Sequence, residues 1–264
     1  MKIIFDKTST TTPYDNVTSF TVDSENANFP KENLRDDFTT NVWRADTGVK
    51  TATITAYVSK GSAVEVLNTN ATSATVKAIS GEEYVFEADW AFEADWALAS
   101  NIILAAAMVY SLPGSGGRLW ADYAEFLVAH TVTVELTADD DVYAGILRAG
   151  YVESFPDPAF GMGESSIDYS VERDLNIGSA YYRKRNVVRQ FNDLSIIDTR
   201  ANIWALKHDI FDAVGPQPLA IRIISSPLGT DWEFVVYAKC LDSPQIEHVT
   251  KDYSRINFTL QEVI

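Results

Sequence analysis

The residues with the most suggestive chemistry lie in a tandem repeat, FEADWA followed by FEADWA, at positions 86–97. Each copy places two carboxylates beside a tryptophan. Sugar sites combine carboxylates with aromatic platforms, and a pair of carboxylates can run glycoside hydrolysis. The acidic residues of the repeat are local in sequence, whereas a hydrolase positions its carboxylates across a cleft, so the pattern favours binding. We expect a candidate glycan site made of Trp90, Trp96, Asp89 and Asp95, with Glu87 and Glu93 as the residues that a glycosidase would need.

Other catalytic signatures are missing from the sequence. The three histidines, His130, His208 and His248, stand near no nucleophile elbow of the type Gly-x-Ser-x-Gly. The GSGG run at 114–117 lacks the lysine and hydroxyl residue of a phosphate loop. The sequence therefore predicts a protein that is not an enzyme, has no catalytic residues and requires no cofactor.

Two acidic turns are the remaining candidates for metal binding. Asp139–Asp141 and the pair Asp36 and Asp37 offer the hard oxygen ligands that Ca²⁺ prefers. Their spacing does not match an EF-hand loop, and a solvated turn explains them equally well. We therefore assign no metal ligands.

Charge is distributed unevenly along the chain. The formal net charge is −16, with 10 basic and 21 acidic residues up to Gly150 and 11 and 16 after it. A field of this sign repels nucleic acid and anionic lipid. The basic run of Arg183, Lys184, Arg185 and Arg189 reads either as a solvated strand face or as an assembly interface for the acidic first half of a neighbouring subunit.

The length of 264 residues and the β-rich composition predict two domains. We expect a first domain over 1–150, a Pro- and Gly-punctuated linker over 151–163, and a second domain over 164–264. The start MKIIFDKTST has no apolar segment of the secretory type, and the longest apolar run, 96–110, is shorter than a membrane span. We therefore expect no secretory signal and no membrane insertion.

Apolar periodicity predicts strands in both halves and one helix. Strands are expected at 2–5, 17–22 and 51–58, with a hairpin formed by 64–67 and 74–79. Residues 199–214 have the helical period, with Asp198 or Thr199 as N-cap and Gly215 as the stop. Four apolar residues are expected on one helix face, with Phe211 beside it: Ile203, Leu206, Ile210 and Val214. Three more strands are expected within 218–226, 231–241 and 255–263.

The sequence also predicts whether several individual side chains are buried or at the surface. Trp43 is expected in the core, whereas Trp120 and Tyr123 are expected at the surface. Cys240, the one cysteine, is expected as a buried structural thiol on the same strand face as Phe234 and Val236.

The segment SENANFPKENLRDDFTTNVWRA, residues 24–45, resembles the opening of discoidin-like, galactose-binding-type jelly rolls, in the version carried by virion proteins of tailed bacteriophages. The stretch from Arg118 to Gly150 is similar to the closing strands of the same domains. The resemblance implies a mainly β protein. Its expected parts are an N-terminal jelly-roll β-sandwich and a small α+β domain with one helix on an antiparallel sheet.

The same resemblance implies a function. The expected role is a non-enzymatic structural component of the phage tail tip or baseplate, made in the host cytoplasm and oligomeric in the virion, with other tail proteins as partners. The alternative is an adhesin that recognises a host surface glycan through residues 33–40 and the FEADWA repeat.

Overall fold

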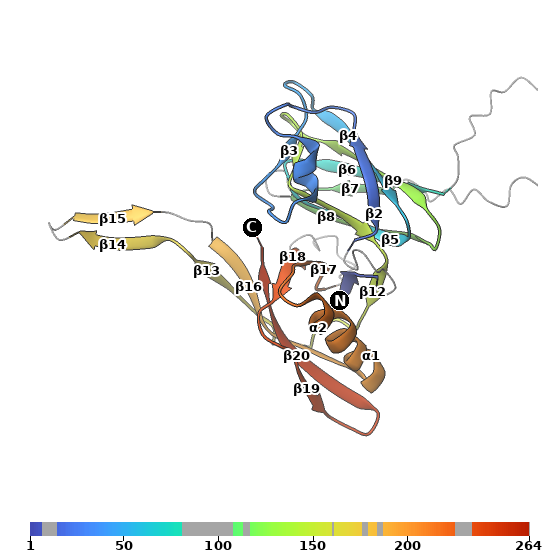
Figure 1. Cartoon of the computed structure of the whole chain (residues 1–264), viewed down its shortest axis with the longest axis vertical. Helices are drawn as coiled ribbons and strands as arrows, with labels where there is room; N and C mark the ends of the chain where they lie inside the picture. Colours follow the sequence, from blue (N-terminus) through green and yellow to red (C-terminus); the bar gives the residue numbers. More distant parts are fainter. Residues whose placement is uncertain are drawn as a thin grey trace, which may run out of the picture.

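The computed structural model describes residues 1–6, 15–80, 108–112, 117–159, 161–175, 179–183, 187–224 and 234–263. Figure 1 shows a β-sandwich that lies on a second sheet, a helical segment on the far side of that sheet, and a narrow β arm that projects to one side. All strand pairs in the described parts are antiparallel. The predicted mainly β fold, with a jelly-roll sandwich before a one-helix α+β part, is confirmed.

The sandwich has two main sheets. The larger contains, in spatial order, β2 (Val17–Val22), β4 (Thr51–Val58), β9 (His130–Thr137), β6 (Ser73–Ile79) and β7 (Met108–Ser111). The smaller contains β11 (Ile146–Gly150), β5 (Gly61–Thr69) and β8 (Gly117–Phe126). At one end, the short strands β3 (Trp43–Arg44) and β10 (Tyr143–Ala144) pair with each other. A 3-10 turn, η1 (Lys31–Arg35), precedes β3.

Strand β4 shows why these residues form a sandwich. Ala52, Ile54, Ala56 and Val58 are buried in the core between the sheets, and the threonines between them are more exposed. A period of two places every second side chain on the core face. The alternation that predicted this strand is therefore the pattern that packs it.

The predicted hairpin of 64–67 with 74–79 is wrong. Both strands exist, but β5 pairs with β8 and β11, whereas β6 pairs with β7 and β9 in the opposite sheet. The connection between them crosses from one sheet to the other. Strand β5 is buried almost throughout, because it packs on the sandwich core with one face and on the C-terminal part with the other.

The second large sheet joins both ends of the chain. Its order is β12 (Val152–Ser154), β1 (Lys2–Ile4), β17 (Leu219–Arg222), β18 (Val235–Cys240), β20 (Tyr253–Glu262), β16 (Val187–Thr199) and β13 (Gly163–Asp168), with β19 (Gln245–His248) also paired to β20. The expected first domain began at residue 1, and residues 151–163 were expected to form a linker between the domains. Instead β1 and β12, from these two segments, pair with each other in the C-terminal sheet.

The predicted helix is confirmed, with one change in its interior. It runs as α1 (Arg200–Ala205), a π-helical turn η2 (Leu206–Phe211) and α2 (Asp212–Val214). The Thr199 side chain caps it by accepting a hydrogen bond from the Asn202 amide, and Gly215 follows the last turn with a φ of 64°. The four predicted face residues and the neighbouring Phe211 are all buried against the sheet. Within the described residues, no helix is long and apolar enough to cross a membrane.

The C-terminal sheet is covered on both faces where β1, β17 and β18 lie. Ile3 and Val236 pack toward the helix, whereas their neighbours Ile4, Val235 and Tyr237 pack toward the sandwich. The sandwich contributes Ala63, Leu67, Trp120 and Ile146 to this contact. We call this contact the junction, and it joins the two parts through a continuous apolar cluster.

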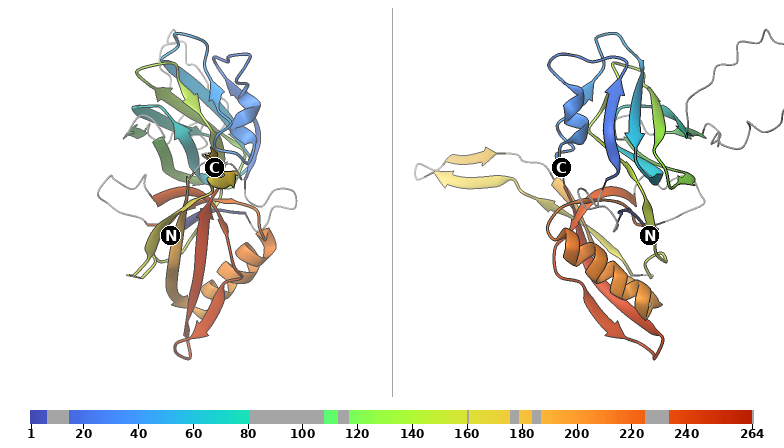
Figure 2. Two further views of the ribbon diagram at one scale, coloured as in Figure 1. Left: turned by 90° about the vertical axis from the view of Figure 1, so that its left-hand side faces the viewer. Right: turned by 45° about the vertical axis from the view of Figure 1, so that its right-hand side comes forward.

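The arm extends the ladder of β13 and β16 away from the rest of the molecule (Figures 1 and 2). Its outer part is a separate two-stranded sheet, β14 (Val171–Leu175) with β15 (Ser179–Arg183). No other described strand pairs with either of them.

Candidate functional site

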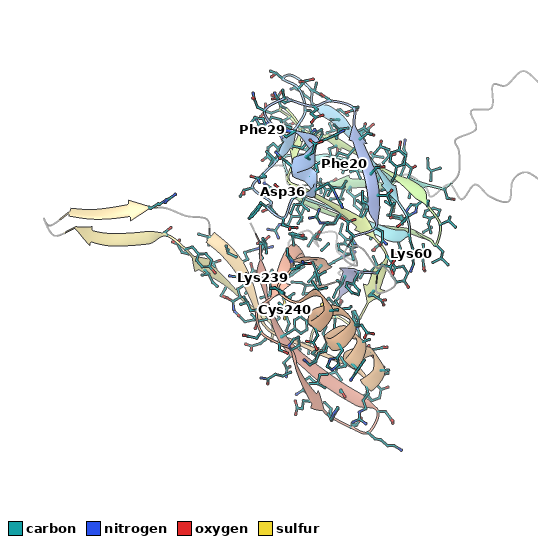
Figure 3. All side chains as sticks on the ribbon, viewed as in Figure 1. Phe20, Phe29, Asp36, Lys60, Lys239 and Cys240 are labelled. Atoms are coloured by element: carbon teal, nitrogen blue, oxygen red, sulfur yellow. The ribbon has the colours of Figure 1, made fainter. Side chains whose placement is uncertain are left out.

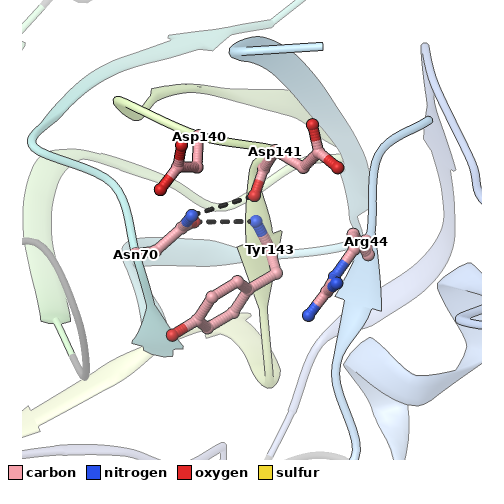
Figure 4. A pocket seen from close by; sticks show the side chains of 5 residues that line it. All are labelled: Arg44, Asn70, Asp140, Asp141 and Tyr143. Carbon is pink, nitrogen blue, oxygen red and sulfur yellow. Dashed lines mark hydrogen bonds between the residues drawn. The ribbon is translucent and has the colours of Figure 1, made fainter. Parts of the chain in front are cut away.

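An open pocket of about 490 Å³ lies at the end of the sandwich where β3 and β10 pair. Its lining residues come from three distant segments: β3, the turn between β5 and β6, and the turn that leads into β10. They are Arg44, Asn70, Asp140, Asp141 and Tyr143 (Figure 4). Tyr143 is the cross-strand partner of Arg44, so their side chains emerge on the same face.

Asn70 holds the pocket together. Its side-chain Nδ2 donates to the Asp141 carbonyl at 2.9 Å, and its Oδ1 accepts from the Tyr143 amide at 2.9 Å. The Asp141 carboxylate in turn accepts from the Gly48 amide at 2.7 Å. Asn70 and Asp141 therefore shape the backbone and position Tyr143, which leaves other side chains to meet a ligand.

Arg44 is held by aromatic rings. Its guanidinium lies 4.7 Å from the centroid of Phe29 and 5.8 Å from that of Tyr143. Among the described residues, it has no ion-pair partner and Nε has no hydrogen-bond acceptor. A cation fixed between rings is pre-organised for a ligand, because its orientation no longer has to be ordered on binding.

The pocket thus presents both donors and acceptors next to an aromatic ring. Arg44 offers N–H donors, the exposed Asp140 offers a carboxylate acceptor, and Tyr143 offers its ring and hydroxyl. A hydroxyl group donates and accepts hydrogen bonds, so a polyhydroxylated ligand satisfies both kinds of partner. The two aspartates disfavour an anion at the same place.

Asp36 and Asp37, one of the two acidic turns considered for Ca²⁺, make protein contacts. Asp36 accepts from the Phe38 amide at 2.9 Å and from Asn41 at 2.6 Å. Asp37 pairs with Arg148 at 3.2 Å and accepts from the Tyr237 hydroxyl at 2.8 Å. Within the described parts of the chain, no group of three His, Cys, Asp or Glu residues is placed to hold a metal ion.

The predicted glycan site and half of the predicted basic interface lie outside the described residues. Trp90, Trp96, Asp89 and Asp95 all fall there, as do Glu87 and Glu93, and Lys184 and Arg185 do as well. Arg183 ends β15 on the arm and is exposed.

Arg189 differs from the rest of its predicted cluster. It lies on β16, where Nε donates to Glu262 at 3.1 Å and Nη1 lies 3.4 Å from Glu164. Its charge is already paired within the chain. The structure therefore does not present Arg189 as a free cation beside Arg183.

Trp43, Trp120 and Tyr123 are all buried in the structure. Trp43 is fully buried, and its indole N–H donates to the Ser24 carbonyl at 3.1 Å, which confirms it as core. The surface prediction for Trp120 and Tyr123 is wrong. Trp120 is buried in the junction, and Tyr123 is buried beside His130 with a hydroxyl-to-Nε2 distance of 3.1 Å.

Cys240 lies beside Lys239 on the C-terminal sheet (Figure 3). As predicted, it packs on the same cluster as Phe234 and Val236, although the side chain is only half-buried. Burial raises the pKa of its thiol to about 11, and Sγ donates to the Asp242 carbonyl at 3.0 Å. A thiol that stays protonated is a poor nucleophile, in line with a structural role.

Sequence reasoning did not find the pocket. Its one local signal was the acidic turn Asp139–Asp141, which suggested a cation instead. Arg44 and Tyr143 meet only because β3 pairs with β10 across almost 100 positions of the chain. The hydrophobic periodicity of a sequence does not indicate which distant strands pair.

Comparisons with known proteins found no matching family model and no matching curated protein. Among solved structures, the chain is similar to chitosan-binding module 1 of a chitosanase/glucanase from Paenibacillus sp. IK-5, with 18% identity and a TM-score of 0.34, over 53% of this chain and 97% of that one. A selenomethionine-labelled mutant of that module matches at 18% and 0.34, over 51% and 94%. Reduced XRCC1 bound to the DNA pol beta catalytic domain matches at 15% and 0.37, over 55% and 100%. At these TM-scores the matches support no functional assignment.

Proposed function

We propose that this chain is a non-enzymatic structural component of a bacteriophage virion, at the tail tip or baseplate, that works through protein–protein assembly. The resemblance of residues 24–45 and 118–150 to phage jelly rolls supplies the context. The projecting arm is the structural observation that carries the proposal.

The arm has the physical properties of a docking element. An isolated two-stranded hairpin is marginally stable in water, because it has no third layer on which to bury a face. The sheet of β14 and β15 also leaves both its outer edges without a described partner strand. Unpaired edges of this kind recruit strands or surfaces of other chains. A partner subunit therefore supplies the missing contacts.

Charge suggests where the arm docks. Arg183 is exposed on β15, and Lys184 and Arg185 follow it in the sequence. The chain up to Gly150 carries 21 acidic residues against 10 basic ones. Opposite charges steer association and fix its register, so the acidic sandwich of a neighbouring subunit is the expected partner.

Two experiments test this function. Mass spectrometry of purified phage particles that encode this chain is expected to find it in the virion, and its absence there would overturn the assignment. Native mass spectrometry of the purified protein is expected to show oligomers that the triple substitution Arg183→Ser, Lys184→Ser and Arg185→Ser weakens. Lys251→Ser, in the turn between β19 and β20, is the control for loss of a positive charge. Oligomers unchanged in the triple variant would exclude the basic segment as the interface.

A second candidate function is carbohydrate binding, and the pocket at β3 and β10 favours it. A guanidinium, a carboxylate and an aromatic ring together match the hydroxyls and the apolar face of a sugar. This site differs from the FEADWA repeat, so the two can be tested separately.

A glycan array tests this candidate. Saturable binding that is lost in Asp140→Ala and Arg44→Gln, and retained when Trp90 and Trp96 are both changed to Ala, places the sugar in the pocket. The opposite pattern places it at the repeat. Binding to no glycan, by a protein that is folded and oligomeric, refutes the adhesin and leaves the assembly function standing.

A further inference from the structure

The junction between the sandwich and the C-terminal sheet contains a fully buried glutamate. Glu65 occupies the middle of β5, between Ala63 and Leu67, on the face that packs against the C-terminal part. Its cross-strand neighbours are Arg148 on β11 and Trp120 on β8. Neither carboxylate oxygen has a hydrogen-bond partner among the described residues.

The arginines closest to Glu65 are engaged elsewhere. Arg148 donates to the Tyr237 hydroxyl at 3.1 Å and pairs with Asp37 at 3.2 Å, and its Nε lies 3.8 Å from Asp15. A buried cation with this many partners has few donors left for another carboxylate.

Arg118, on the other side of Glu65, is also bound by groups other than Glu65. It reaches across the junction to Glu262 at 2.5 Å and donates to the Val235 carbonyl at 2.9 Å. Glu262 also binds Arg189.

Glu65 is the buried carboxylate that belongs to neither ion-pair network. With Glu65 added, the two networks contain four arginines and five carboxylates, of which Asp37 and Glu164 are exposed; among the described residues, each carboxylate except Glu65 has an ion-pair partner. The arginines are Arg35, Arg118, Arg148 and Arg189, and the carboxylates are Asp15, Asp37, Glu65, Glu164 and Glu262. Among the described residues, further charged or titratable groups at the junction include Lys2, Asp122, Arg222 and Tyr237. An isolated buried carboxylate takes up a proton rather than remain charged.

We propose that the junction is an acid-stabilised latch in which Glu65 carries a proton while the sandwich is packed on the C-terminal sheet, and in which its ionisation loosens that packing. The neutral carboxyl is compatible with the apolar cluster of Ile4, Trp120 and Val235 around it. A charged carboxylate at this position has to be hydrated. Water reaches it when the sandwich separates from the C-terminal sheet.

The direction of the pH effect follows from burial. Removal from water raises the pKa of Glu65 well above its ordinary value; Arg148 and Arg118 oppose this change and Glu262 adds to it. The folded state then holds a proton that the unfolded state releases. Stability is full below the ordinary glutamate pKa of about 4.3 and falls as pH rises toward the raised value, by at most about tenfold in the unfolding constant per pH unit.

Urea unfolding of the full chain between pH 5 and pH 9, with Glu65→Gln beside the wild type, tests the latch. Glutamine reproduces the shape of the protonated carboxyl without an ionisable proton. We expect the two proteins to be similar at pH 5 and the variant to become progressively more stable than the wild type as pH rises. Asp15, whose pKa burial also raises, is unchanged in both proteins, so its contribution cancels. Glu135→Gln, on an exposed position of β9, is the control and is expected to follow the wild type.

Two further readouts separate loosening of the junction from global stability. Small-angle scattering is expected to show a larger radius of gyration at pH 8 than at pH 5 for the wild type, and no change for Glu65→Gln. NMR titration of the wild-type Glu65 carboxyl carbon is expected to show a proton retained well above pH 5, which keeps the test valid if the variant folds poorly. A carboxylate already ionised at pH 5, a wild-type radius that does not change with pH, or a folded variant whose stability falls with pH as much as that of the wild type would each overturn the proposal.

Discussion

Replacement of Arg148 by methionine tests how strongly the polar network of the junction contributes to stability. The guanidinium is almost completely buried and contacts Tyr237, Asp37 and Asp15. Methionine keeps much of the aliphatic stem but removes the cation, so the buried Asp15 loses one of its two arginines. Removing one partner of a buried ion pair costs about 3–5 kcal/mol when the remaining charge is left unpaired. Because Asp15 keeps Arg35 and Asp37 is mostly exposed, we expect Arg148→Met to cost about 1.5–3 kcal/mol, the range for losing hydrogen bonds to charged groups.

Chemical denaturation measures this loss directly, provided that the unfolding transition is two-state. Arg255→Met is the matched control, because Arg255 pairs with the exposed Glu247 at 3.3 Å on the far end of β20. An exposed pair of this kind contributes about 0–1 kcal/mol. Adding Tyr237→Phe should reveal a coupling of about 0.5–3 kcal/mol with Arg148→Met. If Arg148→Met cost no more than Arg255→Met, the network would contribute nothing measurable and the reasoning would be refuted.

Three further substitutions test the packing and capping on which the fold depends. Gly150→Ala is expected to destabilise the chain by about 1–3 kcal/mol in urea unfolding, because the added Cβ would lie 2.5 Å from Asn16 Oδ1; an unchanged midpoint would contradict this close packing. Trp43→Phe is expected to cost about 1–3 kcal/mol, because the Ser24 carbonyl loses its donor, and wild-type stability would argue against that hydrogen bond. Thr199→Ala removes the helix N-cap and is expected to cost about 1 kcal/mol by thermal unfolding, whereas Thr199→Ser should retain most of it.

Local patterns in the sequence predicted the elements with one buried face. The alternation of residues 51–58 matched β4, because a strand between core and solvent must alternate. The helical period of 199–214, with Thr199 before it and Gly215 after it, matched the helix because capping acts within one turn. The prediction that Trp43 lies in the core agrees with the structure, because burial of a large aromatic ring near turn residues is favourable.

Long-range pairing was decided by the tertiary structure. A strand at 2–5 was predicted, but the place of β1 in the C-terminal sheet depends on β12 and β17, which lie about 150 and 220 residues away. Strands β5 and β6 are consecutive, yet they belong to opposite sheets. Short apolar runs specify that a strand is buried and do not specify its neighbour, because every antiparallel partner offers the same backbone hydrogen bonds.

For the candidate sites too, local sequence patterns predicted one part and the tertiary structure decided the rest. The sequence by itself determined a β-rich, acidic chain with one capped helix, because composition and period are local properties. Only the tertiary structure decided that Arg44 meets Tyr143, that Trp120 is buried between the two parts, and that Glu65 lies in the junction without a hydrogen-bond partner among the residues that the structure describes. A glutamate flanked by valines reads as an ordinary outward position of a half-exposed strand. Its burial follows from a second layer packing on that face, and the residues of that layer are far away in the chain.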